Sequence, residues 1–232
     1  MENIRIQRNA CENCIHASYC MLPGNSLPQL PALQFQAKML IPGEHLCYQG
    51  QSSENLYILR AGLLKSYFLK PNGDEYIMGF YLPPDLFGFE GIDPLLANIT
   101  LTITAMTPAN ICIIPIEKLS EMTQQSPILQ TQLMRMVSRR IHQDNVALLR
   151  TTAKQRVATF LLQLAARYEQ LQLSSLSIHL HMTHQDIANY LRITSHTISR
   201  IFHEWHNKKI IALEKHAIRL LNVDEIRLIA EY

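Results

Sequence analysis

The chain has 232 residues, of which 47% are hydrophobic, so it can bury the core of one large domain or of two modest ones. Its formal net charge of +2 excludes a polybasic tail but allows a locally basic surface that binds DNA. The N-terminus lacks the apolar stretch of a signal peptide, and no later segment is long enough to span a membrane. We therefore expect a cytoplasmic protein without a membrane partner.

Three of the five cysteines, Cys11, Cys14 and Cys20, lie close together in the stretch CENCIHASYC. Cysteines in a cytoplasmic protein argue against a disulfide framework and for metal or redox chemistry. Cys112 could supply a fourth thiolate from the end of the strand region. Four thiolates suit either tetrahedral zinc or an iron–sulfur cluster, and the spacing alone does not separate the two. Cys47, in the strand-like HLCYQ, is interpreted as a buried core thiol.

Residues 1–34 form a cysteine-bearing segment that ends in a proline-rich linker. Residues 35–120 follow as a predicted sensory domain made of an antiparallel β-roll. Short runs rich in β-branched and aromatic residues alternate there with Pro- and Gly-containing turns, which is typical of a small antiparallel barrel or roll. The PNGD motif at residues 71–74 predicts a hairpin, because Asn-Gly accepts positive φ.

Residues 121–153 are expected to form a long dimerisation helix. Apolar residues recur there at spacings of three and four, which defines an a/d seam and indicates a two-fold homodimer. The alternative is an amphipathic helix that packs on its own β-roll. The seam residues are Met134, Val137, Ile141, Asp144 and Leu148.

Asp144 occupies a seam position where an apolar side chain is expected. In a symmetric dimer two Asp144 carboxylates would face each other, and at about 6 Å with an effective dielectric of about 20 they would repel by about 2–3 kcal/mol. That repulsion is enough to make a modest interface conditional on a further signal. The alternative is a side chain that turns aside to solvent.

Residues 154–232 are predicted to form a winged helix-turn-helix domain. Within MTHQDIANYLRITSHTISRIFHEW, Thr183 and Thr194 are the expected N-caps of two helices separated by a tight turn, and Asp186 completes a capping-box-like pair with Thr183. The following KKIIALEKHAIRLL indicates a two-stranded wing. A closing helix is expected to be capped by Asn222.

The second of these helices has two opposite faces. At 100° per residue, its apolar residues from Ile198 to Trp205 fall together on one side. The other side carries short polar residues and one long cation, the composition of a helix that enters a DNA major groove, although a solvated face is the alternative. Arg200 can bind guanine O6 and N7 in a bidentate pair worth about 1–3 kcal/mol of discrimination. The expected DNA-binding residues are Thr194, Ser195, His196, Ser199 and Arg200.

Over nearly its whole length the chain resembles the CRP/FNR superfamily of bacterial transcription regulators, and specifically its FNR branch of oxygen-responsive iron–sulfur regulators. The resemblance rests on the C-x2-C-x5-C of residues 11–20, on Cys112 before IIP, on NGDEYIMGFYLPPDLFGF, and on MTHQDIANYLRITSHTISR. It implies an α+β fold with an N-terminal antiparallel β-roll like that of cyclic-nucleotide-binding domains, a long dimerisation helix and a C-terminal winged helix-turn-helix.

The resemblance also implies a 4Fe–4S cluster on Cys11, Cys14, Cys20 and Cys112 that favours the DNA-binding dimer when oxygen is absent. The expected partners are a second copy of the chain, double-stranded DNA with a palindromic site, and RNA polymerase. In that family an Asp matching Asp144 restrains dimerisation. The alternative is a dimeric CRP-like regulator whose cysteines bind structural zinc or act as a thiol redox switch. No nucleophile–base constellation, phosphate loop or paired-carboxylate motif indicates an enzyme.

The chain departs from the family pattern at several positions. His196 stands where Glu is usual; glutamate accepts from cytosine N4, whereas neutral histidine donates or accepts, which allows a half-site other than the TTGAT type. Arg192 stands where the turn commonly has Gly, at a small strain cost if its φ is positive. No cyclic nucleotide is expected, because FGFEGIDPLLANITLTITA offers Glu90 but no Arg for the phosphate.

Overall fold

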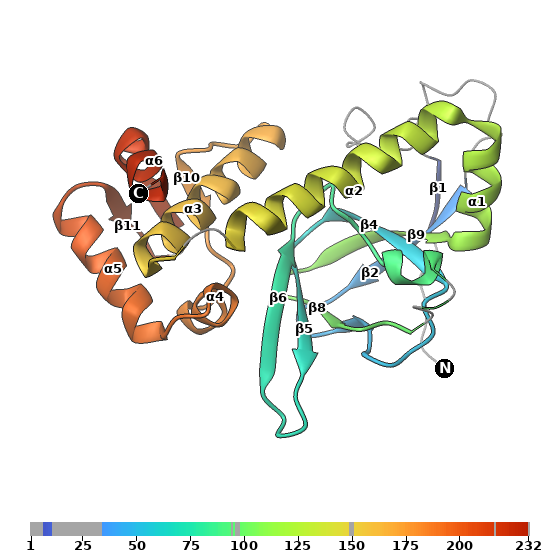
Figure 1. The fold of residues 1–232 in the computed structure, drawn as a ribbon, viewed down its shortest axis with the longest axis horizontal. Helices are drawn as coiled ribbons and strands as arrows, with labels where there is room; N and C mark the ends of the chain where they lie inside the picture. The colour runs from blue at the N-terminus through green and yellow to red at the C-terminus, as the bar shows by residue number, and fades with distance from the viewer. Residues whose placement is uncertain are drawn as a thin grey trace. The chain divides into compact units, whose positions relative to one another are not determined.

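The computed structural model divides the chain into two compact units, residues 1–139 and 140–232 (Figure 1). None of the helices in the described part of the chain has the length and hydropathy that a membrane crossing requires. The structure describes residues 7–10, 34–93, 95, 98–148, 151–215 and 217–231, with the backbone alone at 7–10, 34, 35, 91, 139, 140 and 142–148.

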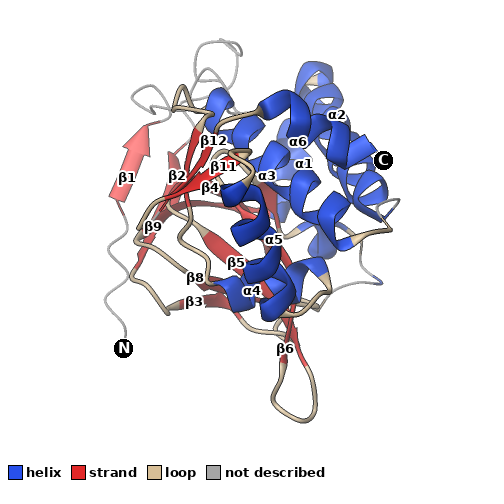
Figure 2. Ribbon diagram, turned by 90° about the vertical axis from the view of Figure 1, so that its left-hand side faces the viewer, coloured by secondary structure: helices blue, strands red, loops and turns tan. Residues whose placement is uncertain are grey.

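The N-terminal unit contains two antiparallel sheets (Figure 2), which confirms the predicted β-roll. A short 3-10 helix, η2 (Phe89–Ile92), follows strand β7. The first sheet has the order β1-β2-β9-β4-β7, with β1 at Gln7–Ala10, β2 at Gln34–Leu40, β9 at Ala109–Pro115, β4 at Asn55–Ala61 and β7 at Leu86–Phe87. The second has the order β3-β8-β5-β6, with β3 at His45–Cys47, β8 at Thr102–Ala105, β5 at Leu64–Leu69 and β6 at Glu75–Tyr81.

Strand β1 was not expected from the sequence, which assigned Gln7–Ala10 to a cysteine-bearing segment outside the roll. It pairs with β2 along the edge of the first sheet, Gln7 opposite Ala37 and Ala10 opposite Gln34. Its residues, QRNA, lack the alternation of apolar and polar side chains that identifies a strand. The rest of the segment up to residue 33, including Cys11, Cys14 and Cys20, lies outside the described residues.

The interior of the roll is filled by aromatic and aliphatic side chains. The ring of Phe87 stacks on Tyr81 with centroids 4.5 Å apart and on Tyr57 with centroids 5.5 Å apart. Cys47 packs in this core and is 3% exposed. Burial raises the pKa of the Cys47 thiol to about 12, so it stays protonated at neutral pH. The interpretation of Cys47 as a core thiol is confirmed.

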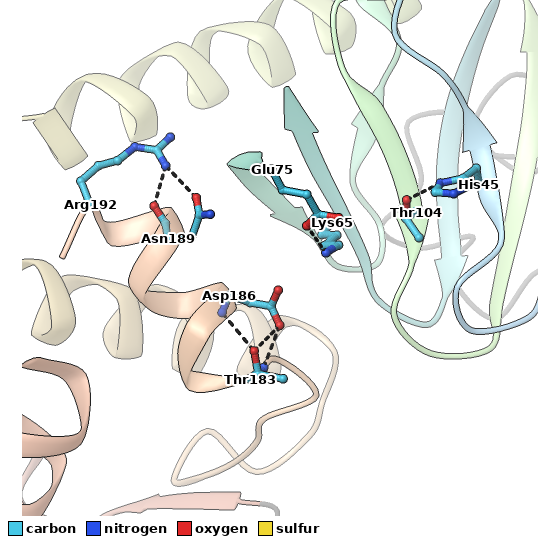
Figure 3. Close-up of polar contacts among 8 residues, drawn as sticks. All are labelled: His45, Lys65, Glu75, Thr104, Thr183, Asp186, Asn189 and Arg192. Atoms are coloured by element: carbon cyan, nitrogen blue, oxygen red, sulfur yellow. Dashed lines mark hydrogen bonds and ion pairs between the residues drawn. The ribbon is translucent and has the colours of Figure 1, made fainter. Parts of the chain in front are cut away.

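The PNGD motif forms the turn of the β5–β6 hairpin, as predicted, and the ion pair between Lys65 and Glu75 joins its two strands (Figure 3). Gly73 has a φ of +86°, whereas Asn72 is not among the residues with positive φ. Asn72 acts through its side chain, whose Oδ1 accepts from Asp74 N at 3.2 Å. The predicted hairpin is therefore confirmed, with positive φ at Gly73 and a turn contact supplied by the Asn72 side chain.

The stretch expected to be one helix over 121–153 is divided in the structure. Helix α1 spans Ile116–Gln125 and helix α2 spans Pro127–Leu148. Ser126 between them is extended, with φ −137° and ψ 97°, because the residue before a proline is disfavoured from helical geometry. Pro127 then begins α2, since the first turn of a helix does not need its missing N–H. A second apolar cluster joins these helices to the first sheet: Leu56, Ile58, Leu86, Ile114, Leu119, Met122 and Leu129.

The C-terminal unit contains helices and a three-stranded antiparallel sheet of order β10-β12-β11, which includes the predicted two-stranded wing. Asn222 caps the last helix as expected: its Oδ1 accepts from Glu225 N at 3.0 Å. The elements are α3 (Ala153–Gln170), β10 (Ser177–His179), α4 (His184–Leu191), α5 (Ser195–Asn207), β11 (Ile211–Leu213), β12 (Ala217–Leu220) and α6 (Val223–Glu231).

Two glycines with positive φ provide a test of the roll. A Cβ at Gly62 (φ +94°) would clash with the Pro108 carbonyl oxygen, whereas a Cβ at Gly73 (φ +86°) would meet nothing within 4 Å. We expect Gly73→Ala to lower the free energy of unfolding by about 1–2 kcal/mol, the cost of left-handed geometry. Gly62→Ala should cost about 2 kcal/mol more, because backbone must move. Urea denaturation followed by far-UV circular dichroism measures both free energies. Equal losses in the two variants would show that the backbone at Pro108 moves aside without cost.

Candidate nucleic-acid interface

The helix-turn-helix begins with the two threonine caps that the sequence predicts. Asp186 N donates to Thr183 Oγ1 at 3.0 Å, and Thr183 N donates back to Asp186 Oδ2 at 3.0 Å, so both bonds of a capping box fix the start of α4 (Figure 3). At the start of α5, Thr194 Oγ1 accepts from Thr197 N at 3.1 Å. Both helix starts are therefore set by local sequence.

The turn between α4 and α5 passes through Arg192, which has φ 57° and ψ 44°. The sequence predicts a strain cost at this non-glycine residue if its φ is positive, and the structure shows that it is positive. The backbone N–H of Ile193 donates to Ala188 O at 3.0 Å, and the Arg192 guanidinium donates to Asn189 O and Oδ1 (Figure 3). These bonds offset a left-handed conformation that costs about 1–2 kcal/mol.

Helix α5 divides into a buried and an exposed face as predicted. Ile198, Ile201, Phe202 and Trp205 are each at most 2% exposed. The opposite face is open to solvent at His196, Ser199 and Arg200, with Ser195 half-buried and Thr194 exposed at the N-cap. One long cation among short polar groups leaves this helix free to approach a base edge closely.

His184 joins this face from the neighbouring helix, a residue that the sequence analysis did not single out. Its Nδ1 lies 3.2 Å from Ser199 Oγ, and its ring meets Phe202 edge-on with centroids 5.4 Å apart. The start of α4 and the polar face of α5 are thus side by side. The Thr183 cap, one residue before His184, is the only sequence signal that could have located it.

Glu204 is held by two lysines at the side of α5. Its Oε1 accepts from Lys154 Nζ of α3 at 2.7 Å and from Lys208 Nζ at 3.0 Å. The hydrogen bond from Lys154, followed by that from Lys208, lowers the pKa of the Glu204 carboxyl. The two lysines therefore offset the carboxylate charge at this side of α5.

Cys112, the fourth expected metal ligand, lies half-buried in β9, opposite Ala37 of β2 and Ile58 of β4. It packs against the apolar cluster between the first sheet and the helices, as do Leu133 and Met136 of α2. Within the described residues no three His, Cys, Asp or Glu side chains lie close enough to hold a metal ion. The other three expected ligands are the N-terminal cysteines outside those residues.

The expected dimer seam lies on α2. Met134 is 69% exposed and Ile141 is 55% exposed, while Val137 is half-buried. The side chains of Asp144 and Leu148 are not among those described. Large apolar side chains exposed along one helix are typical of a surface that a partner covers.

Comparison with known proteins identifies the family. The model of the Crp-like helix-turn-helix domain matches residues 155–229, and that of the cyclic nucleotide-binding domain matches residues 38–126. The transcriptional activator protein Anr of Pseudomonas protegens is 35% identical over 226 residues, covering 95% of this chain and 91% of Anr. The chain belongs to the FNR branch of the CRP/FNR family.

Further similarities agree with membership of the FNR branch. The fumarate and nitrate reduction regulatory protein of Salmonella typhimurium is 33% identical, covering 95% of this chain and 90% of that protein. The solved structure of FixK2 from Bradyrhizobium japonicum has a TM-score of 0.76 at 25% identity, covering 85% of this chain and 98% of FixK2. This FNR-branch chain is a DNA-binding transcription regulator, and its relatives are regulators rather than enzymes.

The cap of α4 provides a test of the helix-turn-helix. We expect Thr183→Ala to lower the unfolding free energy of the C-terminal unit by about 1 kcal/mol, because the first-turn N–H groups lose their acceptor. Gln185→Ala, an exposed position in the same helix, should change it by less than about 0.5 kcal/mol. Urea denaturation followed by Trp205 fluorescence reports on this unit, since Trp205 is the single tryptophan. Indistinguishable variants would show that the cap does not stabilise α4.

Proposed function

We propose that this regulator senses oxygen through a 4Fe–4S cluster held by Cys11, Cys14, Cys20 and Cys112, and that the cluster controls homodimerisation and DNA binding. The observation that carries the proposal is the position of Cys112. Its side chain contacts the same apolar cluster as Leu133 and Met136 at the start of α2. A change at this thiol would therefore alter the cluster against which the proposed dimerisation helix packs.

The donor set and the sheet register fit such a cluster. Iron–sulfur clusters are held by cysteine thiolates, and apolar surroundings and limited solvent access tune their potential. Gln7, Ala37 and Cys112 lie in one row across β1, β2 and β9. Two interstrand steps of about 4.8 Å place β1 about 10 Å from β9, and Cys11 directly follows the last residue of β1. The sheet register thus brings the strand that precedes the N-terminal cysteines to the sheet that carries Cys112, with Ala10 three residues along β1 from the row of Cys112. When bound, the cluster supplies the oxygen-reactive centre.

Dimerisation follows from the seam of α2. Met134 and Val137 lie on the same helix turns as Leu133 and Met136, which pack against the same apolar cluster as Cys112 of β9, so this cluster links the seam to the proposed sensor. The proposed interface is completed by Ile141, Asp144 and Leu148. Facing Asp144 carboxylates would repel by about 2–3 kcal/mol, so the dimer needs the additional order that a cluster at Cys112 gives to α2.

The proposed DNA contacts are Thr194, Ser195, His196, Ser199 and Arg200. A two-fold dimer presents two copies of α5, which matches a palindromic site on double-stranded DNA. We infer that RNA polymerase is a further partner, as for a regulator that acts at promoters, and that the protein works in the cytoplasm. His196 in place of glutamate alters the base preference at one position of each half-site.

No cyclic nucleotide is part of this proposal, although the first unit matches the cyclic nucleotide-binding domain. The stacked rings of Tyr57, Phe87 and Tyr81 occupy the interior of the roll. Glu90 accepts from Thr100 Oγ1 at 3.4 Å, and the segment from Phe87 to Ala105 contains no arginine for a phosphate. The sensing role is accordingly assigned to the cysteines.

The proposed ligand set predicts the metal content of two cysteine variants purified without oxygen. Wild-type protein should hold about four irons and four sulfides per chain and absorb in the visible range. Cys112→Ser should lose most of that iron, because it removes a ligand. Cys47→Ser is the matched control and should keep the iron, since Cys47 lies inside the roll. A colourless wild-type protein that contains zinc would contradict the cluster and support structural zinc. A colourless protein without metal would support the thiol redox switch.

The proposed reading face predicts the effect of Arg200→Ala. The two probes are a duplex selected by the wild-type protein and the same duplex with the contacted guanine replaced. Loss of the bidentate pair should reduce the ratio of the two affinities by about 10- to 100-fold, while the dimer stays intact. Fluorescence anisotropy with both duplexes measures the ratio. Arg227→Ala, which removes a cation that pairs with Asp224 on α6, is the control. Undiminished discrimination by the Arg200 variant would assign the reading to another residue.

A further inference from the structure

Arg156, in the first turn of α3, reaches the turn of the helix-turn-helix. Its Nη1 donates to Leu191 O at 3.1 Å and lies 3.5 Å from Arg192 O. Leu191 is the last residue of α4 and Arg192 its C-cap. Arg156 thus binds the end of α4 from α3, 35 residues before Leu191 in the chain.

The end of α4 is a place where such a contact matters. The last carbonyl groups of a helix have no N–H donor within that helix, and the helix dipole places partial negative charge on them. Arg156 supplies both a donor and a positive charge. The chain must also hold Arg192 at φ 57°, a conformation that a side chain disfavours. A fixed guanidinium across the turn helps to keep this geometry.

The start of α3, which carries Arg156, is fixed by hydrogen bonds from side chains. Thr152 Oγ1 accepts from Gln155 N at 3.2 Å as the N-cap of α3. The Gln155 side chain, in a residue only 7% exposed, accepts from Thr152 N at 2.9 Å and from Thr151 N at 3.2 Å. Farther along α3, the Phe160 ring packs on Tyr190 of α4 with centroids 5.8 Å apart. These contacts fix the first turn of α3, and with it the position of Arg156 beside the α4–α5 turn.

We propose that Arg156 is a positioning residue for DNA reading: it fixes the turn at Leu191 and Arg192 so that α5 keeps its orientation relative to α4. This inference rests on the proposed reading face of α5. Base discrimination needs a bidentate pair in correct geometry, whereas contacts to phosphates tolerate displacement. Loosening the turn should therefore reduce sequence preference more than general DNA affinity.

The test compares two duplexes as probes: one enriched by the wild-type protein from a random-sequence pool, and a scrambled duplex of the same composition. Arg156→Gln should lower the ratio of the two affinities by about tenfold, as expected for loss of a charge-assisted hydrogen bond. Its affinity for the scrambled duplex and the salt dependence of that affinity should stay as in wild type. Arg227→Gln, the same charge change on α6, should leave the ratio unchanged.

A double-mutant cycle separates positioning from a general loss of stability. Arg192→Gly removes the left-handed strain, so Arg156→Gln should lower the ratio less in that background than alone. Hydrogen exchange gives an independent measure: amides of residues 191–195 should exchange faster in Arg156→Gln, while those of α6 should not. Faster exchange throughout the unit would mean unfolding, and would overturn the positioning role.

Two further results would contradict the inference. If Arg156→Gln weakens both duplexes equally and reduces the salt slope by about one, Arg156 contacts a phosphate instead. If it leaves the ratio unchanged, the turn does not need it. A failure of the proposed reading face would be recognised separately, because the wild-type protein would then enrich no sequence from the pool. The hydrogen-exchange measurement would still decide whether Arg156 holds the turn.

Discussion

An apolar cluster joins the first sheet to helices α1 and α2 and places Cys112 in the packing that supports the helix of the proposed seam. Leu56, Ile114 and Leu129 in this cluster are fully buried, and Cys112 packs at its edge. Close-packed interiors transmit a displacement to their neighbours, so the surroundings of this thiol and the start of α2 change together. The same packing therefore supports the fold and links the proposed sensor to the proposed dimer seam.

The C-terminal unit is organised by polar contacts at helix ends. Thr183 and Thr194 fix where α4 and α5 begin, while Arg156 and Arg192 bind the carbonyl end of α4. Buried apolar side chains hold α5 against the unit, while the polar contacts fix where the two helices begin and how the turn between them runs.

Local features were predictable from the sequence, and contacts across the chain were not. The caps at Thr183 and Thr194 and the buried face of α5 depend on residues within one or two turns of each other. Strand β1 carries a polar sequence and exists through its pairing with β2. The role of Arg156 depends on a partner 35 residues away, and the break at Ser126 on a single proline within an otherwise helical pattern. In the candidate site, the polar face was predictable and the placement of His184 beside it was not.

We propose that the state of the thiol site at Cys112 determines association through α2. Sedimentation velocity, detected at the visible absorbance band, tests this proposal when anaerobically purified protein is compared before and after exposure to air. We expect a dimer that carries the absorbance and a shift to monomer as the band disappears. A dimer that persists after the band has disappeared, or a monomer that carries it, would show that the site at Cys112 and the seam of α2 are independent.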